Sequence, residues 1–198
     1  MCIRDRLYPR KETVKPRIAP HRPTPIHLEE KVEREKNYLI QQGIIEPFDG
    51  PVEWCSSPVF VPKNDTEDIR ITVNLRAVNR ALENTHKPIP TVETLKSRFR
   101  GKTVFSKIDF KSAFSQIEIS EESRKFLVFR IGRELFRYKR LTPGLMPASG
   151  EFMDAVWPQL RDISQVEMIH DDVIISGVDQ EDHDAGLRAF LQRITELL

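Results

Sequence analysis

The chain has 198 residues, 39% of them hydrophobic and 31% charged, with a formal net charge of +1. This size allows one or two small domains with a hydrophobic core, and the near-neutral charge gives no global field that would attract nucleic acid or a membrane, although a local groove can still be basic. Two cysteines exclude a disulfide framework and favour a reducing compartment, and the absence of a long apolar run argues against a membrane span or a secretion signal.

The N-terminal half begins with a proline-rich stretch. Residues 1–26 are predicted to form an extended basic lead-in, because 1–25 hold five prolines and seven Lys or Arg against two acidic residues. Apolar residues at helical spacing predict a helix from 27 that stops at Gly43. Two strand-like runs, 56–63 and 69–76, flank the polar stretch NDTED and predict a hairpin.

The middle of the chain alternates a short helix with strands. Thr91 is a helix cap for 92–99, with Glu93 in the first turn. The run 104–108 is a strand that ends at Asp109, and 125–141 forms two strand arms around a turn at Gly132.

The C-terminal part predicts a helix, a hairpin and a final helix. Residues 147–160 read as helical until Pro158 interrupts them, and QVEMI and VIISG form the arms of a tight hairpin. Residues 181–198 are helical and still helical at the last residue, which suggests a fragment. The fold class is α+β, with helices on one face of an antiparallel sheet and subdomains at 27–90 and 91–198.

Two adjacent aspartates, Asp171 and Asp172, lie within the apolar run VEMIHDDVII. Neighbouring carboxylates raise each other's pKa and are costly to bury, so a positive partner is expected nearby. Asp109 ends a strand 62 positions upstream. If these strands are neighbours, three carboxylates converge at a set of oxygen donors that suits Mg²⁺ and phosphoryl transfer.

The residues alone leave alternatives open. A bare pair of aspartates is most often a solvated turn, and an aspartate at a strand end is more often a helix cap. Spacing does not decide between these interpretations and a metal site.

The order of longer blocks decides between them. VFSKIDFKSAFSQIEIS, FRYKRLTPGL and VEMIHDDVIISG resemble the palm of reverse transcriptases, most closely those of gypsy-type long-terminal-repeat retrotransposon Pol polyproteins, and LIQQGIIEP with WCSSPVFVPKNDTEDIRITVNLRAVN resembles the fingers. The resemblance covers 27–198. It implies a right-hand polymerase with fingers at 27–90, a truncated palm at 91–198 and no thumb, acting as an RNA-directed DNA polymerase.

The resemblance also assigns the catalytic and nucleotide-binding residues. It implies that Asp109, Asp171 and Asp172 hold the metal ions, with the main chain of Phe110 beside them. Phe114 matches the aromatic residue under the incoming sugar, where a ring excludes a ribose 2′-OH. Lys63 and Arg70 match the cations that hold the triphosphate.

Other positions are assigned by the same likeness or depart from it. Arg76 and Asn79 fall in the next fingers block, where support or template contact is expected. Ile169 replaces a common aromatic residue, and His170 is expected to face solvent or the template. Gly144 permits close approach to the nucleotide, whereas Pro143 removes a backbone donor from the same loop.

The implied ligands are Mg²⁺, with Mn²⁺ as the alternative ion, deoxynucleoside triphosphates, and an RNA or DNA template with its primer. The family implies a Pol polyprotein in cytoplasmic virus-like particles, without a membrane. The competing interpretations are another metal-dependent phosphoryl transferase or nuclease, and a non-catalytic or incomplete remnant that at most binds nucleic acid.

Overall fold

The computed structural model describes residues 4–5, 14–63, 67–83 and 91–197, and its contacts divide the chain into two units. The larger unit comprises Arg4–Asn84 and Phe114–Ala148, and the smaller unit comprises Thr85–Ala113 and Ser149–Leu198. These boundaries differ from the predicted 27–90 and 91–198, because 114–148 groups with the N-terminal part. The assignment of 1–26, 27–90 and 91–198 as lead-in, fingers and palm stays a prediction.

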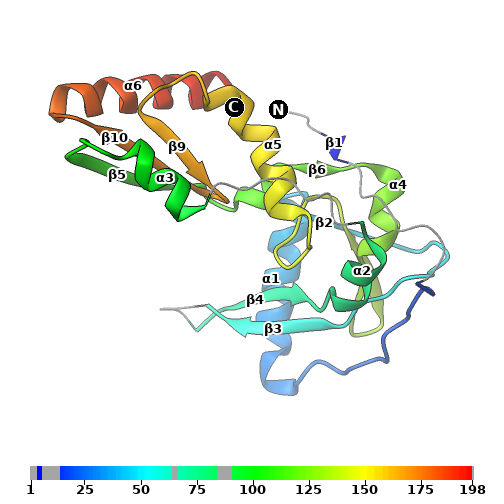
Figure 1. The fold of residues 1–198 in the computed structure, drawn as a ribbon. Coiled ribbons are helices and arrows are strands. Elements are labelled where there is room, and N and C mark those ends of the chain that lie inside the picture. Colours follow the sequence, from blue (N-terminus) through cyan, green and yellow to red (C-terminus); the bar gives the residue numbers. More distant parts are fainter. Residues whose placement is uncertain (1–3, 6–13, 64–66, 84–90, 198) are drawn as a thin grey trace. The chain divides into compact units, whose positions relative to one another are not determined.

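The larger unit carries short strands and helices (Figure 1). Its elements are β1 (Arg4–Asp5), η1 (Ile26–Leu28), α1 (Glu29–Gln41), β2 (Ile45–Pro47), β3 (Pro58–Pro62), β4 (Ile69–Val73), α2 (Arg76–Ala81), η2 (Ala113–Gln116), β6 (Glu118–Ile119), α4 (Glu121–Arg124), η3 (Lys125–Leu127), β7 (Val128–Ile131) and β8 (Glu134–Tyr138). They form the sheets β2-β8-β7 and β3-β4 and the parallel pair β1-β6. The helix predicted to stop at Gly43 is confirmed, and Gly43 has a φ of 63°.

The first predicted hairpin is confirmed, but its second strand is shorter than expected. β3 and β4 pair antiparallel, with Val61 opposite Arg70. The prediction of a strand to residue 76 is wrong, because the strand ends at Val73 and α2 begins at Arg76. The Asn74 carboxamide oxygen accepts a hydrogen bond from the Arg76 backbone N–H at 3.3 Å and so satisfies a donor at the start of the helix.

The second predicted hairpin is also confirmed, with Gly132 at a φ of 57° in its turn. Its first arm starts later than predicted, because residues 125–127 are a 3₁₀ helix and β7 begins at Val128. The buried Arg124 just before this helix donates to the Ile119 carbonyl at 3.1 Å and to Glu118 at 2.8 Å. These bonds stabilise helical turns where the apolar pattern alone indicates a strand.

The smaller unit is an antiparallel sheet with helices. It contains α3 (Val92–Arg98), β5 (Val104–Asp109), α5 (Ala148–Leu160), β9 (Val166–Ile169), β10 (Asp172–Gly177) and α6 (Gln180–Leu197), and its strand order is β5-β10-β9. The Thr91 cap is confirmed, since its side chain accepts from the Thr94 backbone N–H at 3.3 Å. In Figure 1, α6 (orange to red) runs along β10 and β5.

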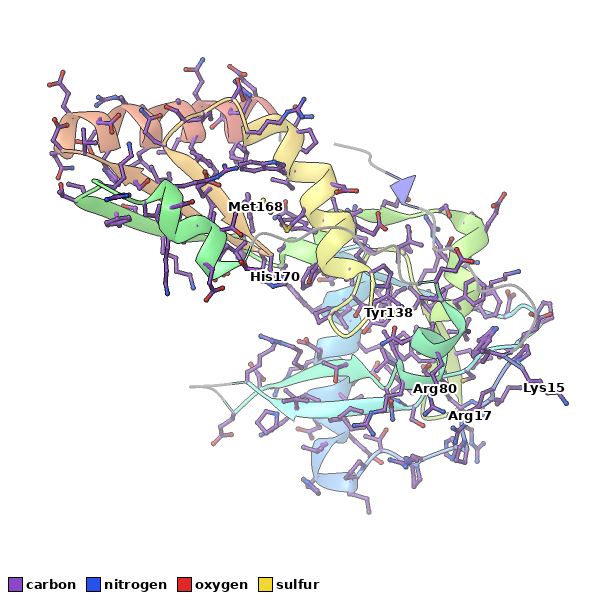
Figure 2. The ribbon with its side chains drawn as sticks, in the orientation of Figure 1. Lys15, Arg17, Arg80, Tyr138, Met168 and His170 are labelled. Atoms are coloured by element: carbon purple, nitrogen blue, oxygen red, sulfur yellow. The ribbon has the colours of Figure 1, made fainter. Side chains whose placement is uncertain are left out.

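One face of this sheet supplies the core of the smaller unit. Val173 and Ile175 of β10 are fully buried, and Met168 of β9 (labelled in Figure 2) is 1% exposed. Phe190 of α6 is buried as well, so the apolar side of the final helix covers the apolar side of the sheet. The alternation along each strand leaves Asp109 and Asp172 on the opposite face.

The prediction that Pro158 ends the helix at 147–160 is wrong. α5 runs from Ala148 to Leu160 with Pro158 inside it. A proline costs one backbone hydrogen bond and crowds the preceding turn. Here only two residues follow it, and the Arg161 N–H still bonds to the Trp157 carbonyl at 3.0 Å. The fully buried Phe152 and Leu160 hold the helix by packing.

We expect Gly177→Ala to destabilise the protein strongly. A Cβ at Gly177 would lie 2.3 Å from the His183 backbone nitrogen and 2.6 Å from the Asp179 carbonyl oxygen, so the α6 backbone has to move. Overpacking of this kind costs about 1–3 kcal/mol in free energy of unfolding. Urea denaturation measures it. In the control Gly50→Ala, the new Cβ meets only the Phe48 ring, which can turn aside; equal losses for both variants would contradict the expectation.

Because Tyr138 is buried, we expect the protein to lose stability at high pH. Burial raises its pKa from 10.0 to about 12, and a hydrogen bond from Thr142 acts in the opposite direction. The unfolded state therefore loses this proton first, and the free energy of unfolding falls between pH 10 and 12, on the order of 2 kcal/mol. Urea denaturation from pH 9 to 12 should show this phase in the wild type and not in Tyr138→Phe. Parallel curves for the two proteins would disprove it.

Candidate active site

The hairpin that presents the adjacent aspartates is as tight as predicted. Asp172 pairs with Ile169, which leaves His170 and Asp171 as a two-residue loop between β9 and β10. His170 has a φ of 56°, a conformation that short hairpin loops require and that histidine adopts more readily than most residues. Figure 2 labels His170, which is exposed at this end of the hairpin. The loop geometry explains why a polar triplet can interrupt two apolar strands.

The strand that ends at Asp109 is the neighbour of the strand that begins with Asp172. In the antiparallel β5–β10 pair, Asp109 is directly opposite Asp172. Directly opposed residues point to the same face, with Cβ atoms about 4.5–5.5 Å apart. Asp171 precedes Asp172 in the loop and is half-buried, so all three predicted aspartates lie at one end of the sheet.

A fourth residue of this face, Lys107, was missed by the sequence analysis. It precedes Asp109 by two positions, and its Nζ lies 2.8 Å from the Asp172 Oδ2 across the strand pair. Asp172 raises the pKa of Lys107 chiefly through this hydrogen bond, and Asp109 and Asp171 add to the effect. The i, i+2 spacing on a strand is the signal that could have found it. The positive partner expected for the aspartates is therefore a lysine of the same sheet.

The donor set suits a hard divalent cation, which prefers carboxylate oxygens. Within the described part of the chain, no three His, Cys, Asp or Glu side chains are close enough together to hold one ion in this structure. Asp109 and Asp172 face each other, but Lys107 is paired with Asp172. Lys107 therefore already occupies one carboxylate oxygen of Asp172 in this structure.

Phe110 turns its ring away from the carboxylate face. The ring packs against Phe152 of α5 at 5.5 Å, edge to face, and against Phe190 of α6 at 6.3 Å, both measured between ring centroids. This packing ties the chain just after Asp109 to the core of the smaller unit. Its main chain, adjacent to Asp109, is the part predicted to lie beside a metal ion, and that role stays a prediction.

The two basic side chains that are predicted to bind the triphosphate, Lys63 and Arg70, come from the β3–β4 hairpin. Lys63 Nζ lies 2.8 Å from the Glu35 Oε2 of α1, and Glu35 is nearly buried. Arg70 is exposed opposite Val61. Lys63 is therefore held by an internal carboxylate, whereas Arg70 is presented to solvent.

Pro143 fits its loop better than the sequence suggests. The Leu145 backbone N–H donates to the Thr142 carbonyl at 3.3 Å, which closes a turn with Pro143 and Gly144 at its centre. Gly144 has a φ of 85°, so the turn has the type II pattern of proline followed by a residue with positive φ. The N–H that proline lacks is not used by this turn.

Asn79 of α2 clamps the same loop from the side. Its carboxamide nitrogen donates to the Gly144 carbonyl at 2.8 Å, and its carboxamide oxygen accepts from the Met146 backbone N–H at 2.9 Å. Of the two roles left open for Asn79, structural support is the one seen here. A template contact through Asn79 stays a prediction.

The remaining predicted residues are distributed over both units. Arg76 is exposed at the start of α2, and Phe114 is half-buried in η2, both in the larger unit. Ile169 is half-buried at the end of β9 in the smaller unit, opposite Asp172. Phe114 and the three aspartates thus belong to different units.

Asn79→Ala should lower the free energy of unfolding by about 1–3 kcal/mol, because both loop partners lose a hydrogen bond. Urea denaturation of the variant and the wild type measures the difference. The control is Asn37→Ala, whose exposed side chain makes one long hydrogen bond within α1, at 3.4 Å to Glu33. A change at Asn79 no larger than that at Asn37 would show that the clamp contributes nothing.

The fold is that of polymerase fingers and palm. A crystal structure of prototype foamy virus protease–reverse transcriptase superposes with a TM-score of 0.84 at 20% identity, covering 96% of this chain and 25% of the viral chain. The foamy viral protein in complex with an RNA/DNA hybrid gives a TM-score of 0.77 at 18% identity, covering 96% of this chain and 26% of the other. The predicted α+β right-hand fold is confirmed by this likeness.

Sequence comparison identifies the family. Residues 61–197 match the family described as "Reverse transcriptase (RNA-dependent DNA polymerase)", and the chain belongs to this family of nucleotidyltransferases. An uncharacterized protein of Caenorhabditis elegans is 33% identical over 199 residues, covering 99% of this chain and 16% of the relative. The enzymatic polyprotein of figwort mosaic virus is 31% identical, covering 73% of this chain and 22% of the relative.

A transposon Tf2 polyprotein of Schizosaccharomyces pombe is 27% identical, covering 81% of this chain and 12% of the relative. The chain therefore spans less than a quarter of the length of these three relatives. The predicted membership of the reverse transcriptases is confirmed, and the closer gypsy-type assignment stays a prediction.

Proposed function

We propose that this chain carries the catalytic carboxylates of an RNA-directed DNA polymerase that adds deoxynucleotides to a primer 3′-hydroxyl. The observation that carries the proposal is the pairing of Asp109 with Asp172 across β5 and β10, with Asp171 in the adjoining loop. A solvated turn would account for the Asp171–Asp172 pair. It would not require a third carboxylate directly opposite on the neighbouring strand.

Asp109, Asp171 and Asp172 would hold divalent cations, Mg²⁺ or alternatively Mn²⁺. When bound, such ions lower the pKa of an attacking hydroxyl and stabilise a leaving phosphate oxygen. Phe110 follows Asp109 directly, so its main chain would lie beside such an ion. The Phe110 ring packs against Phe152 and Phe190 and restrains this end of β5. The rigidity of the two-residue hairpin loop serves the same purpose for Asp171 and Asp172.

The incoming deoxynucleoside triphosphate would be bound by residues of the larger unit. Lys63 and Arg70 on the β3–β4 hairpin supply positive charge for phosphate oxygens, as a point charge and a planar fork. Phe114 would exclude a ribose 2′-OH, and the exposed Pro143–Gly144 turn would lie against the base. Glu35 holds the Lys63 amine in place until the triphosphate competes for it.

The template and primer would be RNA or DNA, contacted by Arg76, Asn79, Ile169 and His170. Support comes from the similar fold of the foamy viral enzyme, whose structures contain an RNA/DNA hybrid and double-stranded DNA. Arg76 and His170 are exposed and suited to phosphate contacts, so binding should weaken as salt rises.

The parent protein would be a Pol polyprotein. Relatives named as polyproteins of a transposon and of a plant virus support this context. Among the described residues, no helix is long and apolar enough to span a bilayer. Cytoplasmic virus-like particles would be the site of action.

We expect any extension of a DNA primer on an RNA template by this chain, in Mg²⁺ or Mn²⁺, to be abolished by Asp171→Asn. Even the outer-shell partners of metal ligands commonly contribute 10–100-fold, so loss of a ligand should lower the rate by more than about 100-fold. The measurement is extension of a labelled primer by the purified 198-residue chain.

The matched control is Asp162→Asn, which removes an exposed carboxylate of the smaller unit paired with Arg193. It should extend primers like the wild type. Extension that is equal in the wild type and Asp171→Asn would refute the proposed carboxylate site. No extension by any of the proteins would favour the incomplete or non-catalytic remnant for this chain.

A further inference from the structure

The proposed mechanism gives no role to the positive charge that lies beside the three aspartates. Two carboxylates directly opposite each other on paired strands repel, and such pairs are destabilising. Asp109 and Asp172 occupy this arrangement, with Asp171 next to them in the loop. Without a compensating positive charge, this end of the sheet would be under electrostatic strain.

Lys107 supplies that charge from within the sheet. It is opposite Ile174 on β10, so it is diagonal to Asp172 and on the same face as Asp109. Its Nζ lies 2.8 Å from Asp172 Oδ2, although the lysine side chain is 65% exposed and Asp172 is 38% exposed. An ion pair this exposed contributes little to folding on its own. Its position among three like charges is what distinguishes it.

We propose that Lys107 is a positioning residue of the carboxylate site, an internal counter-ion that orders Asp172 when no divalent cation is bound and opposes the binding of one. The inference rests on the proposed function, because it takes the three aspartates as the cation ligands. Lys107 and the cation then compete for Asp172. The lysine stabilises the cation-free protein and weakens cation binding.

The first test measures binding of Mn²⁺ alone, through the electron paramagnetic resonance signal of the free ion, at constant ionic strength. Lys107→Met should bind Mn²⁺ about 2–5-fold more tightly, the range expected from loss of one exposed ion pair. Lys107→Arg keeps the charge and should bind like the wild type. Unchanged or weaker binding by Lys107→Met would overturn the inference.

Lys102→Met is the matched control. Lys102 pairs with Asp182 at 2.9 Å in the same unit, so its loss removes a lysine–aspartate ion pair, less exposed than Lys107–Asp172, away from the three aspartates. It should lower the melting temperature without changing the affinity for Mn²⁺. A matching gain in affinity for this variant would show that any lost lysine has the same effect and would overturn the role of Lys107.

The second test needs no cation. The melting temperature of the cation-free protein should fall in Lys107→Met, and the same change made in an Asp172→Asn background should have a smaller effect. Equal effects in both backgrounds would overturn the inference while leaving the proposed function intact. If instead the wild type binds Mn²⁺ no better than Asp172→Asn, the carboxylate site itself is refuted, and the inference falls with it.

Discussion

The register of two antiparallel strands is the constraint on which the rest of the site depends. Asp109 meets Asp172 only because β5 and β10 pair in this alignment, and a slip by one residue would send one of them to the covered face. The buried face enforces the register, since Val173 and Ile175 must remain under α6. At the other end of the same strand, Gly177 lies so close to the backbone of α6 that an added Cβ would collide with it. This close packing also holds the strand in place.

Two of the side chains expected to bind ligands are already paired with an oppositely charged residue of the protein itself. Lys107 pairs with Asp172 in the smaller unit, and Glu35 pairs with Lys63 in the larger. The charged atoms of both pairs lie 2.8 Å apart, and each pair joins two separate segments of the chain. Such pairs keep ligand-binding side chains ordered before the ligand arrives, at the cost of a competition when it binds. Asp172 and Lys63 are therefore preorganised for the ligands they are predicted to bind.

Local patterns predicted the regular elements well and failed where long-range contacts decide. The hairpins and the Thr91 cap follow from alternation and capping rules that act within a few residues. The helical turns before Val128 follow Arg124, whose side chain also bonds to Glu46, 78 positions earlier in the chain. α5 passes through Pro158 because the packing of Phe152 and Leu160 outweighs the lost hydrogen bond.

The sequence by itself determined the family, the choice of three aspartates as candidate metal ligands, and the tight hairpin. Ordered motifs and period-two alternation are local properties of the chain, so they can be read without the fold. Tertiary structure alone decided which charges meet. It set Asp109 opposite Asp172, brought Lys107 to 2.8 Å from Asp172, and turned Asn79 onto the loop after Pro143. These contacts join residues up to 67 positions apart, and strand register and packing, which no local pattern encodes, bring them together.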